Sequence, residues 1–199
     1  DIAGHSSLLT QADTVTAEDF DHTTLKDTNG KVLLGTYITA AGVPGMTIIP
    51  DGVWTFDMYC STDVSSGVTT LHVYILRRAT SIIVNYAGQT GIAFSENTPA
   101  RDTITDSNNG FLTAGFQVAQ EIVVTGAGVN NGTYTIHDVT AGTITLIAAN
   151  DVTTAAAGAP ITITSLSQVL FSVVTTEINA ATATLYATST VQPSFVLNA

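Results

Sequence analysis

β-Branched side chains are the feature of this sequence that most constrains its fold. Thr, Val and Ile occupy 35, 19 and 16 of the 199 positions, whereas the chain has only 4 Glu and 2 Lys. Branching at Cβ costs side-chain freedom in a helix and suits the pleated surface of a sheet. The scarcity of Glu and Lys also removes the usual residues of exposed helical positions. The composition therefore predicts an all-β protein and argues against all-α and doubly wound α/β folds.

Charge is distributed unevenly along the chain, which carries a formal net charge of -11. All five cations lie in the first 101 residues, and residues 102–199 contain acidic side chains but no Lys or Arg. Nucleic-acid binding and contact with anionic membranes both require clustered cations, and no apolar run approaches the roughly 18 residues of a membrane helix. We therefore expect no nucleic acid among the partners and no membrane insertion.

Cysteine and histidine give no sign of a cofactor or structural metal. The single Cys60 cannot form an internal disulfide, and the four His are scattered rather than clustered with it. We expect no cofactor, and we expect stability to come from packing and from neighbouring subunits.

Alternation of apolar and polar residues predicts a series of strands. In residues 53–60 (VWTFDMYC) one face of the expected strand holds the four larger side chains Trp54, Phe56, Met58 and Cys60. The same reasoning predicts strands at residues 31–39, 69–77, 121–125, 132–138, 142–147, 160–164, 168–175, 182–188 and 194–197.

A change of composition divides the chain. Between residues 92 and 165 aromatic residues thin out, and Asn130-Asn131-Gly132 and Ala141-Gly142 read as hairpin turns because Asn and Gly tolerate positive φ. We therefore expect a β-domain split into residues 31–91 and 166–199, with residues 92–165 inserted in a loop as a small β-sandwich or barrel. Residues 1–30 are expected to form an N-terminal arm or linker. Separate consecutive domains remain an alternative, although residues 166–199 would then supply only three strands.

Two sets of segments resemble known proteins. The run DTITDSNNGFL at residues 102–112, followed by NGTYTI at 131–136 and TAGTITL at 140–146, resembles a small β-module of tailed-bacteriophage structural proteins. The outer segments IPDGVWTFDMYC at 49–60 and GVTTLHVYILR at 67–77, with the closing QPSFVLNA, resemble a jelly-roll-like domain of phage tail and fibre proteins.

The resemblance implies a jelly-roll-like β-sandwich carrying a second small antiparallel β-domain inserted in a loop. It also implies a non-enzymatic virion component: a head, collar or tail fibre, or a capsid decoration protein. The expected partners are other virion proteins of the capsid, collar or tail, together with further copies of the chain, a trimer being the family habit. A host-surface glycan is a further expected partner.

One departure from the family pattern concerns the end of the sequence. A further strand usually follows the closing Leu-Asn-Ala, and here the sequence stops at Ala199. Either the sequence is truncated or a neighbouring subunit supplies the last strand, since an open sheet edge invites pairing with another chain.

Acidic residues are the first candidates for catalysis, because glycan hydrolysis needs two carboxylates held across a bond. No spacing pairs any two of the candidates, which are Asp57, Asp63, Glu96, Asp102, Asp106 and Glu177. We interpret them as solvated carboxylates that keep an acidic surface soluble. We therefore expect no enzymatic activity and assign no catalytic, cofactor-binding or metal-binding residue.

The remaining reactive or aromatic residues have structural interpretations. Cys60 is expected to be a buried small apolar residue rather than a nucleophile. His72 and Tyr74 share the strand face opposite Leu71 and Val73, which favours packing or a subunit contact over a ligand site. A carbohydrate-binding β-sandwich module is the alternative function, and it would need Tyr59, Tyr74 and Tyr186 as an exposed stacking platform.

Two loops imitate ligand-binding motifs. The run Asp106–Gly110 (DSNNG) lacks the Gly and Glu positions of an EF-hand, so we predict a turn. The glycine-rich run at 126–132 lacks the dinucleotide-binding spacing and is predicted to join two strands. Asn131-Gly132-Thr133 is formally a glycosylation sequon.

Overall fold

The fold is that of a computed structural model, which describes residues 6–7, 37–38, 47–61, 69–147, 149–182 and 184–196. The strand expected at 31–39 and Asp63 lie outside these residues, except for Tyr37–Ile38. The elements in chain order are β1 (Ser6–Ser7), β2 (Tyr37–Ile38), β3 (Ile48–Ile49), β4 (Gly52–Cys60), β5 (His72–Arg78), β6 (Val84–Gln89), β7 (Ile92–Ser95), β8 (Thr103–Asp106), α1 (Phe111–Ala114), β9 (Glu121–Thr125), the 3-10 turn η1 (Gly128–Asn130), β10 (Gly132–Val139), β11 (Thr143–Leu146), β12 (Ile161–Ser165), β13 (Ser167–Val174), β14 (Thr184–Gln192) and β15 (Phe195–Val196).

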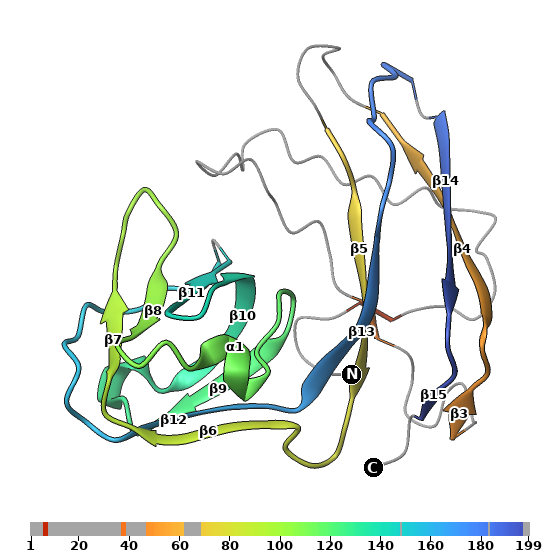
Figure 1. The fold of residues 1–199 in the computed structure, drawn as a ribbon. Coiled ribbons are helices and arrows are strands. Elements are labelled where there is room, and N and C mark those ends of the chain that lie inside the picture. The colour runs from red at the N-terminus through yellow and green to blue at the C-terminus, as the bar shows by residue number, and fades with distance from the viewer. Residues whose placement is uncertain are drawn as a thin grey trace.

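The protein is all-β, as the β-branched composition predicts. Its largest sheet has seven antiparallel strands in the order β6-β12-β9-β10-β11-β8-β7. Figure 1 shows this sheet wrapped into one lobe, with β4, β5, β13 and β14 forming a second lobe beside it. Helix is confined, within the described residues, to the single turns α1 and η1.

Strand β10 lets the seven-stranded sheet fold over its own core. Its first half pairs with β9, and its second half pairs with β11 after a register shift between Ile136 and Asp138. A bulge of this kind bends a strand and turns an extra side chain inward, and both Ile136 and His137 are buried. The core enclosed by the sheet includes the fully buried Ile92, Phe94, Ile104, Phe111, Phe116, Ile122, Ile144, Leu146 and Ile163.

The second lobe is a thin sandwich of two antiparallel two-stranded sheets, β5/β13 and β4/β14. The ring of Phe171 in β13 meets Trp54 of β4 edge-on at 5.2 Å and stacks on Phe195 of β15 at 5.7 Å. Trp54, Phe56, Met58 and Cys60 alternate with exposed residues as predicted. They are only half-buried, because a two-stranded layer is too narrow to cover them fully.

The strands β3 and β15 extend the β4/β14 sheet without changing its register. Ile48 pairs with Val196 and Ile49 with Phe195, and the same register continues from Gly52–Gln192 to Cys60–Thr184. Pro50 and Pro193 interrupt the pairing because proline has no N–H to donate. We call the whole pairing of residues 48–60 with 184–196 the ladder.

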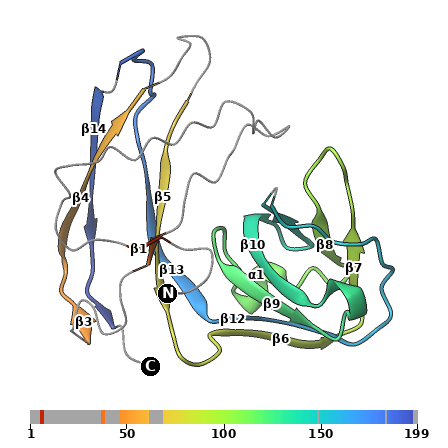
Figure 2. The same cartoon turned by 180° about the vertical axis from the view of Figure 1, so that it is seen from behind.

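The seven-stranded sheet begins earlier than the boundary expected at residue 92. Strand β6 lies within the expected outer segment 31–91, yet it pairs with β12. Val84 of β6 is buried in the core of that sheet. The burial of this apolar side chain explains why β6 belongs to the seven-stranded sheet. The two views of the fold show β5 and β13 lying between this sheet and the ladder (Figures 1 and 2).

The hairpin between β9 and β10 forms where it was predicted, but the reason given for it was wrong. Asn131 has extended φ, and the positive φ values belong to Gly126 at 81° and Gly128 at 62°. No helix among the described residues is long and apolar enough to cross a membrane.

Candidate interaction surface

The outer face of the ladder gathers the largest group of exposed apolar side chains among the described residues. Three directly opposed pairs contribute, with exposed fractions between 45% and 76%: Ile48–Val196, Val53–Val191 and Tyr59–Leu185. Single exposed apolar residues are ordinary, and the gathering of such residues in opposed pairs on one sheet face distinguishes this surface. This face is therefore the strongest candidate for a functional surface.

Within β4 and β14, strand alternation explains why Val53, Tyr59, Leu185 and Val191 point outward. Trp54, Phe56 and Met58 turn toward the β5/β13 layer, so Val53, Thr55, Asp57 and Tyr59 must face away from it. On β14 the same alternation turns Leu185, Ala187, Ser189 and Val191 outward. Both views place the ladder on the side of the molecule remote from the seven-stranded sheet (Figures 1 and 2).

The polar residues of this face lie between its apolar pairs. Thr55 is opposite Ser189, and Asp57 is opposite Ala187. The described arginines lie elsewhere: Arg77 donates to Gln168 at 2.9 Å and to the Val196 carbonyl at 2.9 Å, Arg78 pairs with Glu121 at 3.3 Å, and Arg101 is buried. Between the Val53–Val191 and Tyr59–Leu185 pairs, the face therefore presents one carboxylate, that of Asp57, together with the hydroxyls of Thr55 and Ser189.

A cluster of aromatic rings packs against the inner side of the ladder, beneath this face. Phe171 contacts Trp54, Phe56 and Phe195, and all four rings lie between the ladder and the β5/β13 sheet. Edge-on and offset stacked rings are favourable geometries that add to their burial. The outer face is consequently carried by a packed layer.

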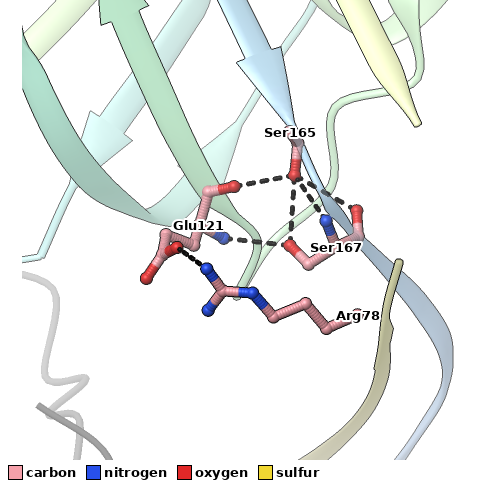
Figure 3. Close-up of polar contacts among 4 residues, drawn as sticks. All are labelled: Arg78, Glu121, Ser165 and Ser167. Atoms are coloured by element: carbon pink, nitrogen blue, oxygen red, sulfur yellow. Dashed lines mark hydrogen bonds and ion pairs between the residues drawn. The ribbon is translucent and has the colours of Figure 1, made fainter. Parts of the chain in front are cut away.

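A polar junction connects this sandwich to the seven-stranded sheet, as Figure 3 shows. The Ser165 hydroxyl donates to the Glu121 carbonyl at 2.7 Å, and the Glu121 N–H donates to Ser167 Oγ at 3.2 Å. Gln120 Nε2 donates to the Ser167 carbonyl at 2.9 Å, and Arg78 pairs with the Glu121 carboxylate at 3.3 Å. Ser165, Ser167 and Gln120 are buried, so this junction satisfies polar groups that water cannot reach.

Two of the six candidate carboxylates are buried, so their interpretation as solvated groups was wrong. Asp102 accepts from the N–H of Asn97 at 2.8 Å and from that of Val152 at 2.7 Å. Asp106 accepts from Tyr86 at 2.6 Å and from the N–H groups of Asn108 and Gly110, both at 2.9 Å. These acids are buried because they satisfy backbone donors that have no partner in the sheet.

The pKa values around Asp106 reflect this arrangement. Burial by itself raises the pKa of Asp106, but the hydrogen bonds from Tyr86, Asn108 and Gly110 outweigh it and hold the pKa below its ordinary value. Burial first, and then the hydrogen bond and charge of Asp106, raise the pKa of Tyr86 to about 12. Asp106 therefore fastens the turn that was predicted at residues 106–110.

The other candidate acids do not form a paired site. Asp57 lies on the outer face of the ladder and Glu177 is exposed. Glu96 lines a polar hollow of about 280 Å³ together with Asp151, Asn130 and Thr153. Sequence reasoning missed Asp151, whose proximity depends on the pairing of Phe94 with Ala155.

The histidine, cysteine and tyrosine candidates are separated in the structure. Cys60 is half-buried on the inner face of the ladder, and burial raises the pKa of its thiol. His72 and Tyr74 stack at 6.4 Å on the face of β5 opposite Val73, as expected. Burial and then the charge of Asp138 raise the pKa of Tyr74.

The three tyrosines of the carbohydrate-binding alternative do not form one platform. Tyr59 is exposed on the outer face of the ladder, whereas the Tyr186 side chain points to the inner face. The Tyr186 hydroxyl accepts from the backbone N–H of Asn179 at 3.2 Å. A sugar could not stack on all three rings at once.

Neither loop that imitates a ligand-binding motif forms such a site among the described residues. The run at 126–132 joins β9 to β10 through η1, and the Asn131 side chain accepts from the N–H of Ala127 at 2.7 Å. The part of the chain that the structure describes has no group of three or more His, Cys, Asp or Glu side chains able to hold a metal.

Comparisons of this chain with protein-family models, with curated proteins and with solved structures found no match.

Proposed function

We propose that this chain is a non-enzymatic structural component of a tailed-bacteriophage virion, where it acts in particle assembly or host-surface contact. The outer face of the ladder is the observation that carries the proposal. Its opposed apolar pairs are held on a packed aromatic layer. An exposed surface of this kind suits a protein whose task is to hold neighbours.

The narrow sandwich also supports a role within a larger assembly. Each of β4, β5, β13 and β14 has a single hydrogen-bonded neighbour among the described residues. Two-stranded sheets are marginal by themselves in water, and open strand edges favour association with another chain. Association with copies of itself and with other virion proteins would both cover these edges.

The buried acids support a structural rather than a hydrolytic use of the carboxylates. The carboxylate oxygens of Asp102 and Asp106 accept hydrogen bonds from backbone N–H groups and, at Asp106, from the Tyr86 hydroxyl. An acid that is committed in this way is poorly placed to protonate a leaving group.

Quantitative peptide mass spectrometry of purified virions from the source material tests the proposal. An abundance close to that of the major capsid protein would support a decoration role. A small fixed number of copies per particle would support a collar or a fibre. Absence of the chain from the particles would refute the proposal.

A further inference from the structure

The outer face of the ladder has a regular order of side chains along its strands. Starting from Pro50, the cross-strand pairs are Val53–Val191, Thr55–Ser189, Asp57–Ala187 and Tyr59–Leu185. All eight side chains are exposed. Large apolar pairs thus lie at both ends, with a hydroxyl pair and a carboxylate beside each other in the middle.

The face can pack against an identical face that runs in the opposite direction, because the two sets of side chains then complement each other. A two-fold axis in the plane of the face, perpendicular to the strands and level with the Phe56–Thr188 pair, places residue 53 over residue 59 of a second copy. The Val53–Val191 pair then meets Tyr59–Leu185, and Thr55 meets Asp57. Apolar side chains therefore cover apolar side chains, and each carboxylate meets a hydroxyl donor.

We propose that the outer face of the ladder binds the same face of a second copy of this chain about this two-fold axis. The contact deepens the assembly role proposed above and identifies the surface that performs the self-association. A contact between identical faces is isologous and closes at two copies. The structure therefore favours a dimer at this surface over the trimer expected from the family resemblance.

Charge favours the two-fold axis level with Phe56 over axes at neighbouring residues. It also favours hydroxyl groups as the partners of the Asp57 carboxylate. An axis level with residue 57 would stack the two Asp57 carboxylates on each other, which costs free energy. The described arginines are held by Gln168, Val196 and Glu121, or buried in the case of Arg101. Among the described residues, the hydroxyls of Thr55 and Ser189 are therefore the donors that this face of a second copy can offer.

The size of the face predicts a weak contact. Residues 53–59 extend over roughly 20 Å of strand, and the ladder is two strands wide, about 5 Å apart. Such a patch is smaller than the about 800 Å² per partner of a stable complex. Dimerisation is therefore expected at high micromolar concentration in solution, and a crowded particle surface would strengthen it through effective concentration.

Net charge adds a salt dependence of definite sign. Each copy carries a formal charge of -11, so two copies repel each other at long range. Because salt screens exposed charges beyond about 10 Å, a higher salt concentration should tighten the dimer. A contact held mainly by exposed ion pairs would weaken instead.

Sedimentation velocity of the full chain, from low micromolar to near-millimolar concentration, is the experiment that tests this contact. Val191→Thr keeps a β-branched residue on the strand and replaces one methyl group with a hydroxyl in each half of the interface. The dimer constant should weaken by about tenfold, since both copies lose the burial. Val196→Thr is the matched control: it has the same chemistry on the same ladder but lies beyond the overlap, and it should leave the constant unchanged.

Charge variants at one position test the register. Thr55→Lys places an ammonium over Asp57 of the second copy, twice in each dimer, and should tighten association. Thr55→Glu places a carboxylate there and should abolish it. Circular dichroism of each variant confirms that the fold is retained, since every substituted side chain is exposed in the single chain.

The contact is tested on the purified chain alone, so its failure and the failure of the virion proposal are distinguishable. A chain that remains monomeric at every concentration, or that forms a trimer, would overturn the dimer. A dimer that Val191→Thr and Val196→Thr weaken equally, or that responds in the same direction to Thr55→Lys and Thr55→Glu, would also overturn it.

Discussion

Replacing Phe171 with Ala should weaken the sandwich. Phe171 is 8% exposed and contacts the rings of Trp54 at 5.2 Å, Phe195 at 5.7 Å and Phe56 at 6.3 Å. Truncating a buried Phe costs about 3–5 kcal/mol. We expect the lower end of that range, because Trp54 and Phe56 are half-buried and the site can partly collapse.

The chain itself supplies the assay. Its single Trp is Trp54, so tryptophan emission reports on the sandwich, while far-ultraviolet circular dichroism reports on all the sheets. A loss of about 3 kcal/mol should lower the melting temperature by roughly 6–12 °C if the chain unfolds as one unit. The Trp54 emission should shift to the red at the lower temperature.

Val174→Ala is the matched control for this experiment. Val174 lies on the same strand but points outward and is 44% exposed, so its truncation should change the free energy of unfolding by under about 0.5 kcal/mol. If Phe171→Ala were as mild as Val174→Ala, the aromatic cluster would not be the core of the sandwich.

Three further predictions concern the seven-stranded sheet and the junction. The pKa of Tyr86 is raised to about 12. The contribution of the protonated hydroxyl to the free energy of unfolding should therefore be complete below about pH 10, the ordinary tyrosine value, and be lost as the pH rises from there through 12. Tyrosinate absorbance should show this titration, and Asp106→Asn should move it to lower pH. Gly110→Ala should destabilise the sheet by about 2 kcal/mol or more, because its Cβ would collide with the Tyr86 hydroxyl and ring; urea unfolding as stable as that of the parent chain would contradict this. Ser167→Ala should lower the free energy of unfolding by about 1–3 kcal/mol, because it leaves a buried hydrogen-bond network unsatisfied. Glu121→Gln should lower it by under about 1 kcal/mol, because the ion pair that it breaks is partly exposed. The reverse order in urea unfolding would argue against the junction described above.

The sequence predicted the β class and much of the sandwich, because those features depend on local alternation. Residues 53–60 and 168–175 correspond closely to β4 and β13. Strands β6, β7 and β8 were not predicted, although Ile92 and Phe94 alternate with Ala93 and Ser95. Their segments are short and rich in small or polar residues, so their strand conformation depends on pairing with distant partners.

The buried acids and the ladder face could not have been predicted from the sequence in the same way. The Asp102 carboxylate accepts from Val152, fifty residues later in the chain, and no local pattern carries that information. The outer face of the ladder depends on the register between β4 and β14, which brings Val53 to Val191 and Tyr59 to Leu185. Alternation could predict which residues share a face, but not which strand lies beside them.

Hydroxyl-radical footprinting of Tyr59, in the dilute chain and in purified virions, tests whether the outer face of the ladder is covered in the particle. Tyr59 is 72% exposed on the outer face of the ladder, and Val129 is 82% exposed on the turn between β9 and β10. We predict that Tyr59 is oxidised in the dilute chain and protected in the particle, while Val129 reacts in both. Equal oxidation of Tyr59 in the two samples would contradict the claim that this face holds neighbouring subunits.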